Sequence, residues 1–174
     1  MSLLPNILIT NYKIVKSTYI SKERERALEK YSESEKSMKK YEYFEVTADI
    51  GFKAHGKDIN EAFENAGLAI FNIISDTSGI NPVKEIGFEI VSEDDVSLLY
   101  DYLEELLFFH ETEFMLFSEF HVQITEGFHL KAIIKGEEIN WDRHVRKTEI
   151  KAITFHEMDV KKSETTEVQA IVDL

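Results

Sequence analysis

The acids Asp49 and Asp173 and the last residue, Leu174, carry the oxygen atoms in this sequence best suited to hold a cation. Asp173 and Leu174 directly follow the apolar run Val168–Val172, so an aspartate carboxylate and terminal main-chain oxygens are adjacent. Hard oxygen donors of this kind suit Ca²⁺ or Mg²⁺ and resist soft metals. Asp49 would complete the set only if the fold brought it to the same place, which spacing in the sequence does not determine.

Asp49 lies in a polar step between two short β-leaning runs, Tyr41–Val46 and Ile50–Ala54. A carboxylate at such a bend can leave the strand ladder and point to another group. The alternative is that it only hydrogen-bonds the backbone of the bend, as aspartate commonly does in turns. The sequence alone leaves both interpretations open.

Lys151 lies in the stretch Glu149–Met158, where strand alternation places it on the same side as Ile153 and Phe155. An ammonium group beside apolar neighbours needs a carboxylate partner or must extend to the surface. His156, on the opposite side, is expected to be a hydrogen-bonded core histidine rather than a base.

Several common catalytic and metal motifs are absent from the sequence. It has no phosphate-binding loop, dinucleotide fingerprint or nucleophile elbow. It also has no cysteine, and its six histidines include no pair at metal-ligand spacing. A zinc site is therefore not expected.

The charge distribution argues against direct nucleic-acid binding. The net charge is −13, although residues 1–40 hold nine Lys and Arg against five Asp and Glu, so the rest is more acidic still. Phosphates repel such a surface, and a cation or a basic protein is a better partner. No apolar run approaches the roughly 20 residues of a membrane helix, and no signal peptide is evident. We therefore expect a cytoplasmic protein without a membrane partner.

Two stretches predict amphipathic helices, Ile59–Ser75 and roughly Asp94–Thr112. The first begins with Asp58 and Glu61 at capping-box spacing and continues with an apolar stripe at helical intervals. The second has an apolar stripe of Val96, Leu99, Tyr100, Leu103, Leu106 and Leu107. It leads into an aromatic cluster that is expected to pack: Phe108, Phe109 and Phe114.

The remaining β-leaning stretches lie apart from the helices and complete the predicted fold. They are Val83–Val91, Phe117–Thr125, Phe128–Lys135, Thr148–Val160 and Val168–Leu174. Together they predict the α+β class: a compact two-layer sandwich of mainly antiparallel strands with two main amphipathic helices. Residues 38–174 would form this domain. Residues 1–37 would be a polar extension, either a flexible arm or the product of a start codon assigned too early.

The order and spacing of several short motifs resemble the archease family, small activators of the tRNA-splicing RNA ligase of the RtcB type. The resemblance covers about residues 38–174. It rests on Lys40–Tyr43, Thr47–Gly51, Glu61–Glu64, Leu103–Leu107, Gly136–Glu137, Ile150–His156 and Val172–Leu174.

The resemblance implies a partner and a site. Archeases are not themselves enzymes; they help the ligase become guanylylated by GTP with a divalent metal, and turn over repeatedly in tRNA splicing. The family's metal site matches Asp49, Asp173 and Leu174, with Ca²⁺ expected in preference to Mg²⁺ or Mn²⁺. Lys151 matches a lysine implicated in activation of the partner.

One position departs from the family pattern. The family usually has Asp-His-Thr-Ala-Asp where this chain has Glu-Val-Thr-Ala-Asp, ending at Asp49. An imidazole at position 46 is therefore missing, while Glu45 keeps a carboxylate.

Two functions of other classes are kept as alternatives. One is a metal-dependent small-molecule hydrolase that uses Asp49 and His156, which would be active in isolation. The other is a chaperone-like protein modulator, which would suppress the aggregation of unrelated proteins.

Overall fold

The computed structural model describes residues 39–47 and 49–174, and residues 39–174 belong to one compact unit. The predicted polar extension, residues 1–37, lies outside the described residues and stays a prediction.

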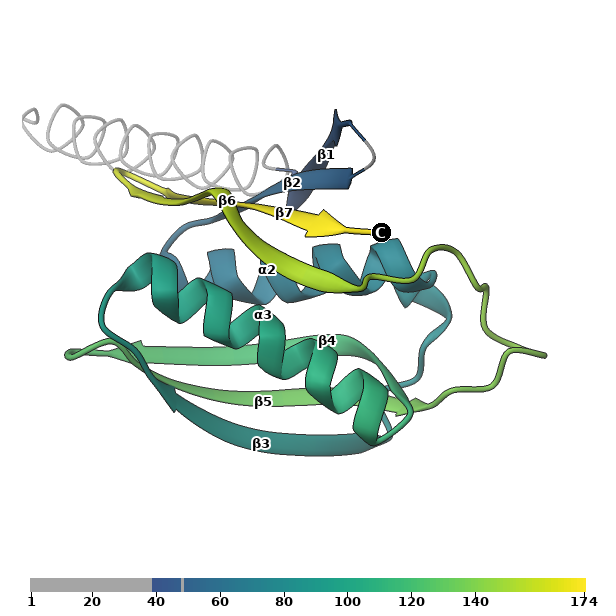
Figure 1. The fold of residues 1–174 in the computed structure, drawn as a ribbon. Helices are drawn as coiled ribbons and strands as arrows, with labels where there is room; N and C mark the ends of the chain where they lie inside the picture. The colour runs from purple at the N-terminus through teal and green to yellow at the C-terminus, as the bar shows by residue number, and fades with distance from the viewer. Residues whose placement is uncertain (1–38, 48) are drawn as a thin grey trace, which may run out of the picture. The chain divides into compact units, whose positions relative to one another are not determined.

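The described residues form two antiparallel sheets with two long helices between them (Figure 1). The helices are α2, Ile59–Ile74, and α3, Asp95–Thr112. The four-stranded sheet has the order β1 (Tyr41–Val46), β2 (Asp49–Gly56), β7 (Thr166–Asp173) and β6 (Ala152–Lys162). The three-stranded sheet has the order β3 (Lys84–Val91), β5 (His129–Glu138) and β4 (Met115–Thr125). The predicted α+β class, with antiparallel strands and two main helices, is confirmed.

The start of α2 shows how local chemistry fixes a helix boundary. Asp58 accepts a hydrogen bond from the main-chain nitrogen of Glu61 at 3.0 Å. The Glu61 carboxylate in turn accepts one from the main-chain nitrogen of Lys57 at 2.7 Å. Two donors at the helix entrance are thus satisfied, as in a capping box. The apolar stripe of α2 is then buried between the sheets.

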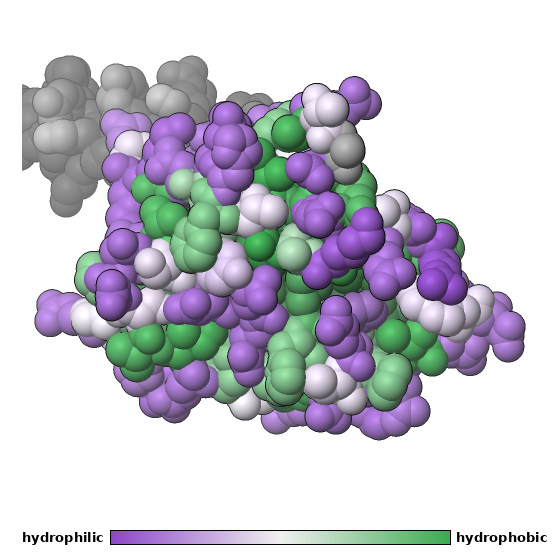
Figure 2. All heavy atoms as spheres, in the orientation of Figure 1, coloured by the Kyte–Doolittle hydropathy of each residue, from purple (hydrophilic) through white to green (hydrophobic). Residues whose placement is uncertain are grey.

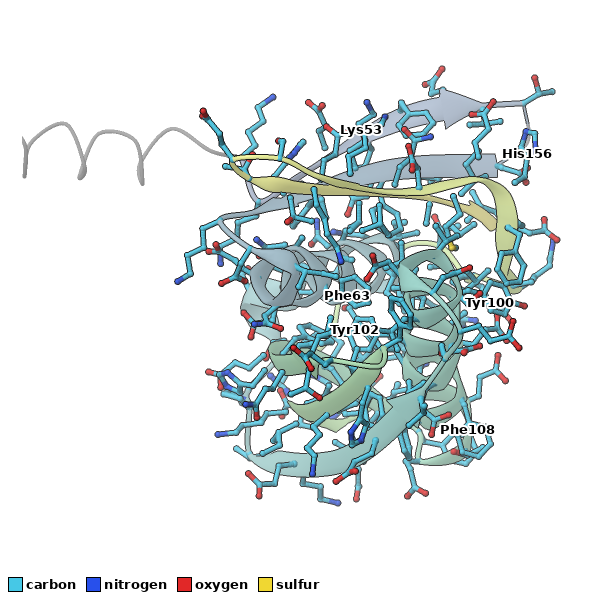
Figure 3. The ribbon with its side chains drawn as sticks, turned by 90° about the vertical axis from the view of Figure 1, so that its left-hand side faces the viewer. Lys53, Phe63, Tyr100, Tyr102, Phe108 and His156 are labelled. Carbon is cyan, nitrogen blue, oxygen red and sulfur yellow. The ribbon has the colours of Figure 1, made fainter. Side chains whose placement is uncertain are left out.

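Tyr102 of α3 lies in the centre of the core, although the predicted stripe included Tyr100 instead. The Tyr102 ring is fully buried, 5.6 Å from the ring of Phe63 (Figure 3). Tyr100 lies nearer the surface and stacks on Phe155, with the ring centroids 3.9 Å apart. Phenylalanines that follow the leucine stripe also differ from expectation. Phe108 is 53% exposed and Phe114 is 70% exposed, so the prediction that they pack in the core is wrong for both.

Side chains of the helices protect the outer edges of two strands. Glu64 and Asn60 of α2 accept hydrogen bonds from β4, at the main-chain nitrogens of Val122 (2.9 Å) and Ile124 (2.8 Å). Glu104 of α3 accepts one from β6 at 3.2 Å. Unpaired edge donors invite pairing with another chain, and these carboxylates and amides occupy them.

One face of the molecule carries polar side chains with apolar ones between them (Figure 2). Hydrophilic side chains cover most of the face in Figure 2, and hydrophobic side chains appear only in separate groups between them. Among the described residues, no helix combines the length and the apolar character needed to cross a membrane.

The loop after β5 is held by Glu137. Its carboxylate accepts hydrogen bonds from Arg143 at 2.5 Å and from the main-chain nitrogen of Asn81, and lies 3.3 Å from the buried ring of His144. Burial alone would raise the pKa of Glu137, but the donors from Arg143, Asn81 and His144 outweigh it and lower the pKa to about 2. Glu137 thus holds the loop that leads to Lys151 against the end of β5.

Gly136 of β5 leaves no room for a side chain. A Cβ added there would lie 1.8 Å from the main-chain oxygen of Leu116, in a part of β4 that cannot move without breaking the sheet. We expect Gly136→Ala to lower the free energy of unfolding by at least about 2 kcal/mol, measured by urea denaturation. Gly79→Ala is the matched control, because nothing lies within 4 Å of its added Cβ. Equal stability of the two variants would contradict the close approach.

Glu137→Gln should change how stability depends on pH. A carboxyl with a depressed folded pKa stabilises the protein fully above its unfolded pKa, near 4.3. That contribution is lost as the pH falls through the folded pKa of about 2. We therefore expect the variant to be less stable at neutral pH and to lose less stability between those two values, in urea titrations at several pH values. Glu126→Gln, in the exposed turn before β5, should behave like the wild type.

Candidate functional site

Asp49 and Asp173 face each other across the centre of the four-stranded sheet. Antiparallel β2 and β7 pair in a register that sets Asp49 opposite Asp173, at the end of the ladder. Directly opposed residues in such a pair point to the same face, with Cβ atoms about 5 Å apart. The two predicted acids are therefore brought together, although they are far apart in the sequence.

The two acids lie on the outer face of this sheet. Phe52 and Ala170 pair with each other and are fully buried toward the helices. Side chains alternate between the faces of a strand, so Asp49 and Lys53 point to the opposite side. Figure 3 shows Lys53 on that side, away from Phe63 and Tyr102. Asp49 is half-buried and Asp173 is exposed, which leaves the pair open to a partner or an ion.

Leu174 and Lys151 complete the group that the sequence pointed to. Leu174 follows Asp173, and the Lys151 ammonium donates a hydrogen bond to the main-chain oxygen of Leu174. The main-chain nitrogen of Lys151 donates to the main-chain oxygen of Asp173 at 2.9 Å. Lys151 is exposed and precedes β6, whereas Ile153 is buried, so the ammonium extends to the surface, which is one of the two outcomes predicted for it. Its partner is a main-chain oxygen instead of a side-chain carboxylate.

Phe44 of β1 packs closely against β2, the strand that carries Asp49. A Cβ on Gly51 would lie 2.2 Å from the Phe44 ring, so the ring rests directly on the backbone of β2. Ile171 of β7 is opposite Gly51 and only 1% exposed, although it lies on the outer face. The Phe44 ring therefore packs on β2 two residue pairs away from the two acids.

The donor set fits a hard cation in its chemistry. It consists of two carboxylates and a main-chain oxygen, which are ligand types of Ca²⁺ and Mg²⁺. Among the described residues, no group of three or more His, Cys, Asp and Glu side chains is placed to hold a metal ion. A site here would thus depend on Leu174 and on water as well as on the two acids.

His156 does not lie in the core, and the prediction that it does is wrong. Its side chain is 71% exposed, on the outer part of β6 (Figure 3). The neighbouring Glu157 has a positive φ of 52°, and the pairing of β6 with β7 shifts between Thr154 and Asp159. This irregular backbone breaks the alternation on which the prediction depended.

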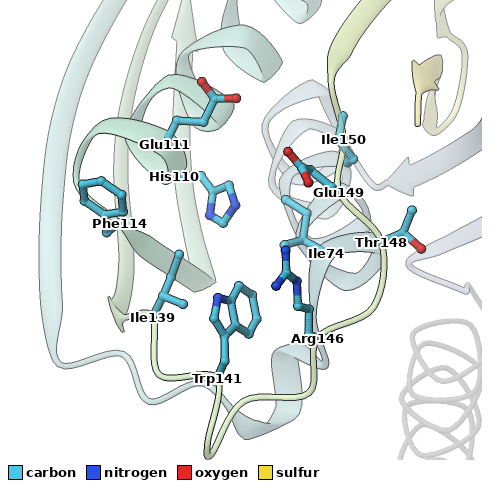
Figure 4. Close-up of a pocket in the computed structure, with 10 residues that line it drawn as sticks. All are labelled: Ile74, His110, Glu111, Phe114, Ile139, Trp141, Arg146, Thr148, Glu149 and Ile150. Carbon is cyan, nitrogen blue, oxygen red and sulfur yellow. The ribbon is translucent and has the colours of Figure 1, made fainter.

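A pocket at the C-terminal end of α3 was not predicted from the sequence. It has a volume of about 350 Å³ and is shown in Figure 4. We call it the α3-end pocket; the residues that matter for its chemistry are His110, Glu111, Phe114, Trp141, Arg146 and Glu149. The only available signals were the single tryptophan and the aromatic residues after α3, and neither indicates a cavity.

Comparisons with known proteins agree on one family. The family model described as "Archease protein family (MTH1598/TM1083)" matches residues 41–174. A protein archease from Methanothermobacter thermautotrophicus is 54% identical over 126 residues, which cover 71% of this chain and 89% of that protein. A protein archease from Sulfurisphaera tokodaii is 43% identical over 125 residues, covering 71% of this chain and 90% of that protein.

A solved structure shows the same fold. It is the solution structure of Methanobacterium thermoautotrophicum protein 1598, with 50% sequence identity and a TM-score of 0.72. The match covers 79% of this chain and 100% of that chain. The family model spans both acids, the curated relatives and the solved structure agree with it, and the chain belongs to the archease family.

Proposed function

We propose that this protein activates a tRNA-splicing RNA ligase of the RtcB type by promoting its metal-dependent guanylylation by GTP. The observation that carries the proposal is the register of β2 and β7, which sets Asp49 opposite Asp173 beside Leu174. Family membership supports a protein partner, and the paired acids supply a chemical reason for a metal-dependent role. The protein acts as an activator and not as an enzyme in its own right.

Each residue of the group has a distinct part in this proposal. Asp49, Asp173 and the main-chain oxygen of Leu174 hold a divalent cation, Ca²⁺ in preference to Mg²⁺ or Mn²⁺. The cation would supply charge compensation for the phosphates of GTP in the ligase active site. Lys151, tethered to Leu174, adds a positive charge at the edge of the same site.

Val46 marks how this chain differs from the usual family pattern. It pairs directly with Asp49, so an imidazole at this position would flank the acid. Here the neighbour is apolar, and the site depends on oxygen donors alone. Oxygen donors favour hard cations over the metals that imidazole binds well.

The acidic body determines how the partner docks. The net charge of −13 favours a basic surface, such as a channel that otherwise holds RNA. Activator and RNA would then occupy the ligase in alternation. The protein itself is not expected to bind nucleic acid directly, because its surface repels phosphates.

Asp173→Ala should abolish the stimulation of the ligase without unfolding the protein. Asp173 is exposed, so its loss leaves no cavity, but it removes one of the two carboxylates. We expect Ca²⁺ affinity, measured by calorimetry, to fall at least about tenfold. Single-turnover guanylylation of the cognate ligase should return to the rate without activator.

Glu126→Ala is the control for this test, because it removes an exposed carboxylate from the turn between β4 and β5. It should stimulate the ligase like the wild type. Normal guanylylation with Asp173→Ala would refute the assignment of this acid.

Lys151→Met should separate metal binding from activation. The ammonium repels a divalent ion held beside Leu174, so its removal should tighten Ca²⁺ binding by about three- to tenfold at low salt. Stimulation of guanylylation should nevertheless be lost, because the positive charge is absent from the site. Lys131→Met, which removes a charge from β5 in the other sheet, should change neither quantity. Weaker Ca²⁺ binding by Lys151→Met would instead mean that Lys151 only holds Leu174 in place.

A further inference from the structure

The α3-end pocket has an aromatic and aliphatic lining that is open to solvent. Phe114 is 70% exposed and Trp141 is 39% exposed, and both line the pocket. Phe114 has a positive φ of 54°, which is uncommon for a bulky residue, directly after the end of α3. Exposed aromatic side chains around a concave site are typical of places that bind another molecule.

Three negative groups lie at this pocket: two carboxylates and the C-terminal end of a helix. Glu111 comes from the last turn of α3 and Glu149 from the segment before β6, and Figure 4 shows both on the side away from Trp141. Both are exposed, and within the described part of the chain neither forms an ion pair. The C-terminal end of α3 adds the negative end of the helix dipole. Arg146 is the only Lys or Arg among the lining residues, so the two carboxylates outnumber it and the pocket favours a further cation.

Arg146 shows that the aromatic floor accepts a guanidinium group. Its guanidinium carbon lies 5.4 Å from the centre of the Trp141 ring, within the range of a cation–π contact. This places one cation of the chain itself against the tryptophan, while the two carboxylates across the pocket remain without one.

We propose that the α3-end pocket binds an arginine or lysine side chain from a basic segment of the protein partner. The charged head lies between Glu111 and Glu149, and the aliphatic stem lies against Phe114. A protein segment is favoured over a free small cation because another exposed aromatic residue, Phe108 (53% exposed), lies three residues before Glu111 on the same side of α3. The identity of the partner as the ligase rests on the proposed function, but the binding of a basic side chain does not.

The pocket is continuous with the candidate metal site along the chain. Glu149 and Ile150 line the pocket, and the next residue, Lys151, donates to the main-chain oxygen of Leu174. Consecutive Cα atoms are about 3.8 Å apart, so a partner anchored at Glu149 lies within about two residues of Lys151. A basic side chain bound in the pocket would hold the partner next to Lys151 and the candidate metal site.

Trp141 allows the pocket to be tested directly, because it is the only tryptophan of the chain. The full-length protein is titrated with acetyl-Gly-Arg-Gly-amide while tryptophan fluorescence is recorded at low salt. We expect a saturable change, and at least about tenfold weaker binding of the peptide with neutral citrulline in place of arginine. Equal responses to both peptides, or no response to either, would overturn the proposal.

Variants identify the carboxylates. The double variant Glu111→Gln, Glu149→Gln should weaken binding of the arginine peptide at least about tenfold. The double variant Glu126→Gln, Glu164→Gln loses the same net charge from two exposed turns outside the pocket, and it should bind like the wild type. Equal weakening in both double variants would show that only the overall charge matters, and would overturn the site.

A second measurement separates this inference from the proposed function. The pocket double variant should raise the concentration of activator needed for half-maximal ligase guanylylation, with unchanged Ca²⁺ affinity. If the wild type binds the arginine peptide but does not stimulate the ligase, the proposed function fails and the pocket stands. If the wild type stimulates the ligase and the pocket variant does so at the same half-maximal concentration, the pocket is not the anchor of that partner.

Discussion

The antiparallel pairing of β2 with β7 is the contact on which the rest of the structure depends. It joins an early strand and the last strand of the sequence at the centre of one sheet, with β1 and β6 at the edges. The same ladder buries Phe52 and Ala170 against the helices and presents Asp49 and Asp173 on the other face. One register therefore determines which side chains enter the core and which form the candidate site. A shift of one residue in the pairing would turn the buried side chains outward and the acids inward.

Local chemistry in the sequence was enough to predict the elements but not their partners. Asp58 and Glu61 predict the start of α2, because helix capping depends on residues only a few positions apart in the sequence. The pairing of Asp49 with Asp173 has no such signal, because strand partners far apart in sequence are chosen by burial over the whole sheet. The group at Leu174 was expected through family resemblance, and spacing alone did not determine it.

The predictions that failed depended on regular alternation or on residue type alone. His156 was placed in the core by strand periodicity, but β6 is irregular around Glu157 and turns the imidazole outward. Phe108 and Phe114 were assigned to the core as aromatic residues, yet both are exposed. The α3-end pocket could not be predicted, because its walls come from α3, the loop after β5 and the segment before β6, which meet only in the fold.

The central position of β7 also bears on how the protein is made in the cell. During synthesis the ribosome releases β1, β2 and both helices long before residues 166–173 emerge, and until then β2 and β6 lack their common neighbour. The four-stranded sheet must therefore close after translation of its final strand, a long-range step of the kind that makes folding slow. A message that ends early would yield chains with an open sheet and a single acid. Such products would expose the unpaired edges of β2 and β6.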